Sequence, residues 1–206
     1  MRAQRGLTLV EALIALAVAG LLVATLLMVY VQGTRGFTHL QTQALTERVV
    51  ETALMEIESA CRQAMFAEVN NGRLILTFPQ DKDAYGKPVP VRKKETPTYR
   101  AGERTIYYLS DTSGALNPPP GRPRNILWRG VVASNGSVQP DPSWSLLGNT
   151  GQGRIMPITE FIPSVQIKPA GIVVTLTVRS TIQTGEDRYE TRRMRTFLVQ
   201  NANAWR

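Results

Sequence analysis

The stretch Gly6-Leu7-Thr8-Leu9-Val10-Glu11, followed by the uncharged apolar run at residues 12–31, decides how this chain is organised. At about 1.5 Å of rise per helical residue, a run of that length extends roughly 30 Å, which is the thickness of a membrane's hydrocarbon core. The run therefore predicts one transmembrane helix. Glu11 is the only charged residue from Gly6 to the end of the run, so an acid at this place needs an explanation.

Two ordinary kinds of segment could contain such a run. A secretory signal peptide also begins with basic residues, but its apolar core is about 7–15 residues long and ends at a small-residue cleavage site. The run here is longer, and its acid, Glu11, lies at the N-terminal end of the run, opposite to the end where a signal peptide has its cleavage site. A single-pass anchor is the second alternative, because a charged side chain near a helix end can reach the membrane interface at small cost.

A third interpretation explains the acid. With Arg2 and Arg5 before it, the stretch from Gly6 to Glu11 resembles the type III signal of type IV pilins and pseudopilins. In that signal a basic leader ends at a glycine. The residues that follow are, in order, an apolar residue, Thr, Leu, either Val or Ile, and then Glu. The resemblance implies that prepilin peptidase cuts between Gly6 and Leu7 and that Leu7 becomes the N-methylated amino terminus. Leu7 stands where the family most often has Phe, which bears only on the efficiency of cleavage.

The resemblance also implies a role for Glu11, which would be the fifth residue of the mature chain. A carboxylate in the first turns of a helix is favoured by the helix dipole, and in lipid it still requires a cationic partner. In the family that partner is the free amine of an adjacent subunit. Glu11 would then form an assembly charge pair that sets the stagger between subunits.

Charge gives the expected orientation and bears on partners. Arg2 and Arg5 precede the span, so the positive-inside tendency keeps that end cytoplasmic and places the remainder outside the cytoplasm. With the family resemblance, this predicts a single-pass protein of the bacterial inner membrane with a periplasmic C-terminal domain that joins a filament after assembly. The chain has 24 basic and 16 acidic residues and a net charge of +8. That excess of positive charge fits nucleic acid or anionic lipid as a partner, but it is equally compatible with a basic surface that only contacts water.

An amphipathic helix is predicted to continue beyond the span. Apolar residues recur at steps of four, three, four and four, at Val50, Leu54, Ile57, Cys61 and Met65. Charged residues occupy the opposite positions, so one face packs and the other meets water. The two halves are predicted to form one helix of about 55 residues, with Gly33 and Gly36 as the soft point between them.

Neither the lone histidine nor the lone cysteine indicates a reactive site. His39 has no companion at ligand spacing and is interpreted as solvated or interfacial. Cys61 lies on the apolar face, where a thiol behaves as a small hydrophobe, and a single cysteine excludes an intramolecular disulfide.

Short β-rich segments separated by Gly and Pro follow the helix. Asn70-Asn71-Gly72 is a turn signal. A basic loop at residues 79–104 holds Arg92, Lys93 and Lys94, the candidate polyanion contacts. The predicted strands are residues 73–78, 105–109, 125–133, 164–167, 171–182 and 188–200.

The last two predicted strands form a hairpin. Ile172, Val174, Leu176 and Val178 alternate onto one face, which is expected to meet the core. On the final strand, Met194 and Leu198 share a face that is also expected to meet the core. Three arginines of that strand are expected to protect an exposed sheet edge; they are Arg192, Arg193 and Arg195.

The predicted fold class is α+β and pilin-like. A long N-terminal α-helix, transmembrane in its first half and amphipathic in its second, packs on a C-terminal antiparallel β-sheet. The divisions are a leader at residues 1–6, a transmembrane and assembly half at 7–31, an amphipathic half at 32–66 and a β-rich domain at 67–206. This order resembles J-type pseudopilins of type II secretion and W-type minor pilins, through the surroundings of Leu127-Trp128-Arg129, Val165 and Leu176.

The sequence predicts a structural protein and not an enzyme. It contains no phosphate-binding Gly loop, nucleophile elbow or paired histidines, and it gives no reason to expect a metal or another cofactor. The expected function is a minor pilin or pseudopilin, placed in the tip or initiation complex of a type IV pilus or a type II secretion pseudopilus. The expected partners are other pilins through the N-terminal helix, the prepilin peptidase and methyltransferase, and the inner-membrane assembly platform.

Two other functions remain open. One is a minor pilin of a DNA-uptake system whose basic loop binds DNA weakly, although Asp81, Asp83, Glu95 and Glu103 interrupt the cations of that loop. The other is a membrane-tethered extracytoplasmic domain that does not polymerise.

Overall fold

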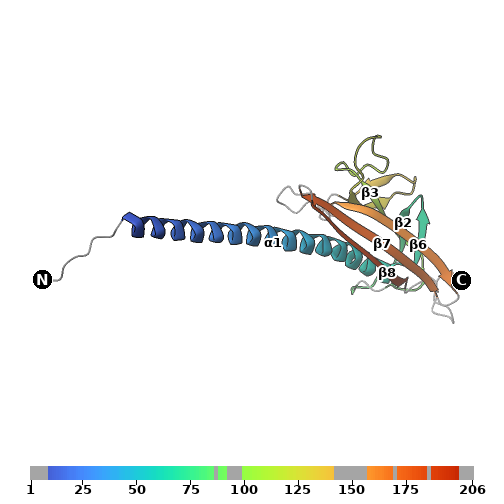
Figure 1. Ribbon diagram of the computed structural model, residues 1–206. Coiled ribbons are helices and arrows are strands. Elements are labelled where there is room, and N and C mark those ends of the chain that lie inside the picture. The colour runs from blue at the N-terminus through green and yellow to red at the C-terminus, as the bar shows by residue number, and fades with distance from the viewer. Residues whose placement is uncertain are drawn as a thin grey trace. The chain divides into compact units, whose positions relative to one another are not determined.

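The computed structural model describes residues 9–85, 88–91, 99–141, 157–168, 171–184 and 187–199. These residues form one helix and eight strands, and every strand pairing is antiparallel (Figure 1). The α+β, pilin-like fold class is therefore confirmed. The elements are α1 (Leu9–Gln63), β1 (Phe66–Asn70), β2 (Arg73–Pro79), β3 (Ala101–Ser110), β4 (Ile126–Val132), β5 (Val138–Pro140), β6 (Ile158–Lys168), β7 (Gly171–Thr184) and β8 (Asp187–Val199).

The helix α1 is continuous over 55 residues and passes through Gly33 and Gly36 without a break. The chain divides into two compact units within this helix, Met1–Thr42 and Gln43–Arg206. The boundary falls six residues after Gly36, so the predicted soft point lies near a change in packing. The helical hydrogen-bond ladder is nevertheless intact there.

The strands of the second unit lie in two sheets, where the sequence predicted one. The first sheet has the order β1-β2-β3-β4-β5, and the second has the order β6-β7-β8. Sequence neighbours are thus also sheet neighbours. The strands β1 and β5 were not predicted, since β1 follows the helix without a Gly or Pro break and β5 has only three residues.

The strands β3 and β6 begin several residues before their predicted starts. Arg104 was placed in the basic loop, but it lies within β3 and forms an ion pair with Glu68 of β1. The strand β6 begins at Ile158, six residues before its predicted start at Ser164. Pro163 pairs in register with Leu176 of β7, and β6 lies at the edge of its sheet, where a proline is tolerated.

The turn predicted at Asn71 and Gly72 is confirmed. Asn70 and Arg73 are paired residues of β1 and β2, which leaves a two-residue loop between the strands. Asn71 and Gly72 have φ angles of 50° and 71°, the signs that a type I′ hairpin turn requires. Asparagine and glycine are the residues that adopt such angles at least cost.

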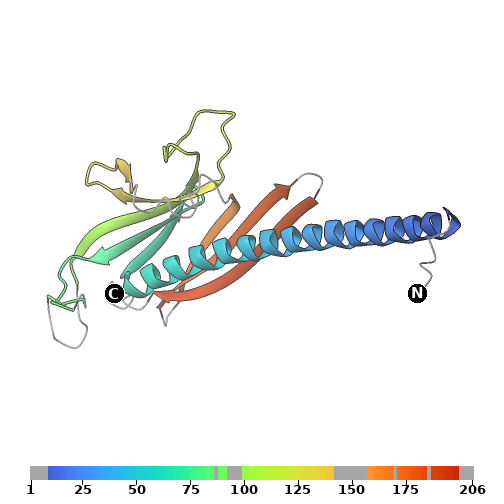
Figure 2. The ribbon, with the colours of Figure 1, turned by 90° about the vertical axis from the view of Figure 1, so that its left-hand side faces the viewer.

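The predicted apolar face of the helix is also confirmed. The side chains of Val50, Leu54, Ile57 and Cys61 are completely buried on it; Met65 is buried as well, but it lies beyond Gln63, where α1 ends, and so it is not part of the helix. The first four belong to one core with residues of both sheets, among them Leu74 and Leu76 of β2 and Val174, Leu176 and Val178 of β7. Figure 2 shows the C-terminal part of α1 lying against the strands of this unit. The helix therefore holds the two sheets together.

Polar contacts fix α1 along β8. The hydroxyls of Thr46 and Thr191 lie 2.9 Å apart, and both side chains are buried. Arg195 of β8 donates to Glu51 at 2.5 Å and lies 3.8 Å from Glu58. A buried hydroxyl requires a partner, so the threonine pair restricts the register of the helix on the strand.

A second apolar cluster, which includes Ile106, Tyr108 and Trp128, is covered by the segment between β3 and β4. The Tyr108 hydroxyl donates to the Gly114 carbonyl at 2.6 Å, and the Trp128 indole N–H donates to the Asp111 carbonyl at 2.9 Å. Hydrogen bonds from Ser113, with smaller contributions from Arg122, lower the pKa of Asp111. This segment is thus fixed by hydrogen bonds as well as by apolar contact.

The expected orientation of β8 is wrong. Met194 and Leu198 are 70% and 52% exposed, while Phe197 and Val199 are buried. Their cross-strand partners explain the difference, because Phe197 pairs with Val174, which faces the core, and Leu198 pairs with Val173, which does not. Paired residues share a face of the sheet. Apolar residues occur on both faces of β8, so composition alone could not identify the inner one.

We expect Leu54→Ala to destabilise the second unit by about 2–5 kcal/mol, because it leaves a cavity in a core that the helix and both sheets share. Met55→Ala, at the adjacent position but 56% exposed, should change stability by less than about 0.5 kcal/mol. Denaturant unfolding of the full chain in detergent micelles, followed by tryptophan fluorescence, measures both. Equal effects of the two substitutions would contradict the assigned helix face.

Candidate membrane-anchoring and assembly site

The acid predicted to act in assembly lies at the start of the helix. α1 begins at Leu9, and Glu11 is in its first turn with an exposed side chain. The unpaired backbone N–H groups of the first turn give that end a partial positive charge, which stabilises a carboxylate there. Gly6 and Leu7, the predicted cleavage residues, lie outside the described residues.

The helix surface that follows is apolar and uncovered. Every side chain from Leu9 to Val31 is exposed, and large ones such as Leu9 (80%), Leu16 (75%) and Leu21 (72%) are almost fully so. Among the described residues, α1 is the one helix long and apolar enough to cross a membrane. Apolar surface of this extent requires cover by lipid or by other protein segments.

The interior polar side chain of the run is compatible with lipid. The hydroxyl of Thr25 donates to the Leu21 carbonyl at 2.5 Å, one helical turn earlier. A polar group in hydrocarbon is costly unless it is hydrogen-bonded, and this bond satisfies the hydroxyl within the helix. The run can therefore enter a bilayer without an unsatisfied side chain at that position.

The polar character of α1 returns just beyond the run. The hydroxyls of Thr34, Thr38 and Thr42 donate to carbonyls one turn earlier, at 2.9–3.1 Å. Arg35 is the first charged residue after the run, and His39 is exposed on the helix surface. Both lie outside the buried helix face, in keeping with the interpretation of His39 as solvated or interfacial.

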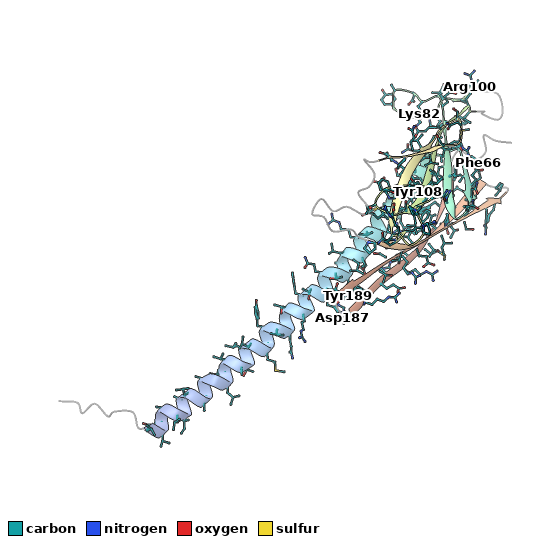
Figure 3. The ribbon with its side chains drawn as sticks, turned by 90° about the horizontal axis from the view of Figure 1, so that it is seen from above. Phe66, Lys82, Arg100, Tyr108, Asp187 and Tyr189 are labelled. Carbon is teal, nitrogen blue, oxygen red and sulfur yellow. The ribbon has the colours of Figure 1, made fainter. Side chains whose placement is uncertain are left out.

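The candidate polyanion contacts, Arg92, Lys93 and Lys94, lie outside the described residues. Figure 3 labels two cations from the ends of that basic segment, Lys82 and Arg100, at one end of the second unit. The Lys82 ammonium lies 5.6 Å from the centre of the Phe78 ring, which is a cation–π distance. Its contact is thus with an aromatic ring of its own chain.

The strand β8 lies at the edge of its sheet, so the predicted location of its arginines is confirmed. Two of the three also form ion pairs. Arg195 pairs with Glu51 and Glu58 of α1, and Arg192 lies 3.5 Å from Glu160 of β6. These pairs connect β8 by charge to α1 and, across β7, to β6.

No reactive centre is evident in the part of the chain that the structure describes. Burial, with a smaller effect of Glu58, raises the pKa of the Cys61 thiol to about 12, which keeps it protonated and unreactive. No group of three His, Cys, Asp or Glu side chains in the described ranges could hold a metal ion.

A groove lies between the end of α1 and the first sheet. It has a volume of about 530 Å³, and Glu56, Lys82, Glu103 and Arg129 are among its lining residues. Arg129 there forms an ion pair with Asp141, so charges of both signs line the groove. Such a lining does not define one substrate chemistry.

Comparison with known proteins bears on the N-terminal segment. Residues 1–27 match the family model for the prokaryotic N-terminal methylation motif. No curated protein and no solved structure matches the chain. The matched residues include Gly6, Leu7 and Glu11 and extend into the uncovered apolar half of α1. The chain thus carries a type IV pilin-like prepilin signal at the start of one N-terminal membrane-anchoring helix.

Proposed function

We propose that this chain is a minor pilin or pseudopilin, a structural subunit that prepilin peptidase processes and that assembles into a filament. The observation that carries the proposal is the coincidence of the methylation motif with a helix whose apolar half is exposed along its whole length. A filament supplies neighbouring helices that can cover such a surface when it leaves the lipid. In a tethered domain that never polymerises, lipid alone would cover this surface, and Glu11 would have no charge pair to form with another subunit.

In this proposal, cleavage occurs between Gly6 and Leu7, and Leu7 receives the N-methyl group. The leader with Arg2 and Arg5 stays on the cytoplasmic side, and the second unit lies outside the cytoplasm. Loss of the leader removes two positive charges and leaves the mature chain with a net charge of +6. The same step creates the free amine that a neighbouring subunit can use as a partner for an acid.

Glu11 is proposed to pair with that amine on an adjacent subunit. Near the bilayer centre an unpaired charge costs about 2.5–3.5 kcal/mol on translocon scales, and less near the interface. Pairing of opposite charges offsets this cost and favours one stagger of the helices. Glu11 is far along α1 from the buried face that begins near Thr46, so this role is separate from folding of the second unit.

We place the subunit among minor components, in the tip or initiation complex, and nearest to J-type pseudopilins or W-type minor pilins. The order of one long helix followed by meandering strands supports this placement. The inner-membrane assembly platform would be a further partner.

DNA uptake is the second candidate function, and the net positive charge favours it. Most described arginines of the second unit, however, are within ion-pair distance of acids of the same chain. These arginines are Arg62, Arg104, Arg122, Arg129, Arg179, Arg188, Arg192 and Arg195. Local pairing of this kind reduces the field available to a polyanion.

The test of the assembly role is Glu11→Gln in the native membrane. We expect at least a tenfold loss of incorporation into sheared filaments, because the variant leaves a neighbour's buried amine unpaired, at a cost of about 3–5 kcal/mol. Membrane insertion, leader cleavage and unfolding of the second unit should be unchanged. Immunoblots of filament and membrane fractions measure incorporation and cleavage.

Glu47→Gln is the matched control, since Glu47 is an acid on the same helix but beyond the apolar run. It should assemble like the unmodified chain. Wild-type incorporation of correctly processed Glu11→Gln protein would show that this acid has no part in assembly, and it would favour a tethered domain.

For DNA, we expect dissociation constants no tighter than about the micromolar range that non-specific binding gives at physiological salt. The full chain in detergent micelles, titrated with duplex DNA over a salt series, provides the measurement. Tight binding that falls steeply with salt, and that is lost when Arg92, Lys93 and Lys94 are changed to Gln, would make DNA binding the leading function.

A further inference from the structure

A small pocket of the second unit opens beside the turn between β1 and β2. Its volume is about 210 Å³. Arg73 and Arg124 line it together with Asn71, Leu109, Leu116 and Phe161. Phe161 is only 7% exposed, so it belongs to the interior of the second unit. The pocket thus combines two guanidinium groups with apolar walls.

The two arginines differ from most others of the second unit because no acid balances them. No Asp or Glu is among the residues that line the pocket. The Arg73 guanidinium donates to two neutral oxygens, the Leu116 carbonyl at 3.2 Å and Asn117 Oδ1 at 2.7 Å. Neither Arg73 nor Arg124 forms an ion pair within the described ranges. Positive charge is therefore concentrated here without a local counterion.

The fold holds Arg73 in place before any ligand arrives. Arg73 is the first residue of β2, directly after the two-residue turn, and its contacts with Leu116 and Asn117 restrict its side chain. The charge of Arg73 also affects Tyr108, a fully buried neighbour that lines the pocket too. Burial raises the pKa of Tyr108 to about 12, and Arg73 opposes that rise. A fixed guanidinium loses less conformational entropy on binding than a free one.

We propose that this pocket binds a carboxylate carried on an apolar stem, as on an acidic side chain of a partner protein. The planar guanidinium presents a pair of N–H donors that match the two oxygens of a carboxylate. Leu109, Leu116 and Phe161 can cover the methylene or ring carbons next to that carboxylate. The proposal concerns the second unit alone and does not depend on cleavage or filament assembly.

A carboxylate fits this pocket better than a nucleic-acid phosphate. Proteins that bind a nucleic-acid backbone present a row of cations along several phosphates, whereas this pocket has two arginines beside the apolar side chains of its wall. A strongly hydrated phosphate would also leave the apolar side chains uncovered. Inorganic phosphate is therefore the competitor that separates the two chemistries.

Hydrocinnamate, a carboxylate with an aromatic stem, is a suitable probe, and the uncharged hydrocinnamamide has nearly the same shape. Ligand-observed NMR with the full chain in nanodiscs measures the apparent affinity of each. We expect the amide to bind at least tenfold more weakly than the acid, since it lacks the charge that both arginines recognise. We expect inorganic phosphate to compete poorly.

Arg124→Gln is the decisive variant. Arg124 is exposed and forms no ion pair within the described ranges, so the variant should unfold at the same temperature as the unmodified chain and bind hydrocinnamate at least tenfold more weakly. Arg193→Gln is the matched control, because Arg193 is an exposed arginine of β8 outside the pocket. Its affinity for hydrocinnamate should not change. Arg73→Gln should also reduce binding, but it removes structural hydrogen bonds as well.

Three results would overturn the proposal. The first is equal affinity for hydrocinnamate and its amide, and the second is unchanged binding by the folded Arg124→Gln protein. The third is competition by inorganic phosphate as strong as binding of the carboxylate itself, which would identify a general anion site.

Discussion

The buried apolar face of α1 is the constraint on which the rest of the structure depends. Val50, Leu54, Ile57 and Cys61 have no exposed surface, and both sheets contribute side chains to the core around them. Neither sheet could bury its inner face without the helix, because a small sheet needs a packing partner for its apolar side. The hydroxyl pair of Thr46 and Thr191 and the ion pairs of Arg195 then align the helix with β8.

The N-terminal half of α1 differs, because its apolar side chains are exposed and not buried by the chain's own strands. From Leu9 to Val31 no side chain is covered by the described part of the chain, so the cover must come from lipid or from other proteins. One continuous helix thus links a segment that needs an external apolar partner to a segment that organises its own domain. A subunit that is first stored in a membrane and then transferred to a filament has these two requirements. The methylation motif at residues 1–27 is consistent with that function.

The sequence predicted what depends on short-range pattern. The helix face, the turn at Asn71 and Gly72, and the alternation of β7 follow from residue spacing, and the structure confirms them. What the sequence could not predict depends on pairing between distant segments. The inner face of β8 is set by its register on β7, and β6 continues through Pro163 because it lies at a sheet edge. Arg73 and Arg124 are 51 positions apart, and only the fold brings them into one pocket.

We propose that the N-terminal stretch is a processed assembly signal, and the mass of the mature protein provides the sharpest test. Intact-mass and N-terminal peptide spectrometry on protein extracted from its native membrane identify both the first residue and its modification. We expect a chain that begins at Leu7 and carries one methyl group on its terminal amine. A chain that begins at Met1 would be an uncleaved anchor, and a chain cut beyond Val31 would be a secreted protein without the apolar half of α1. Either result would contradict the proposal.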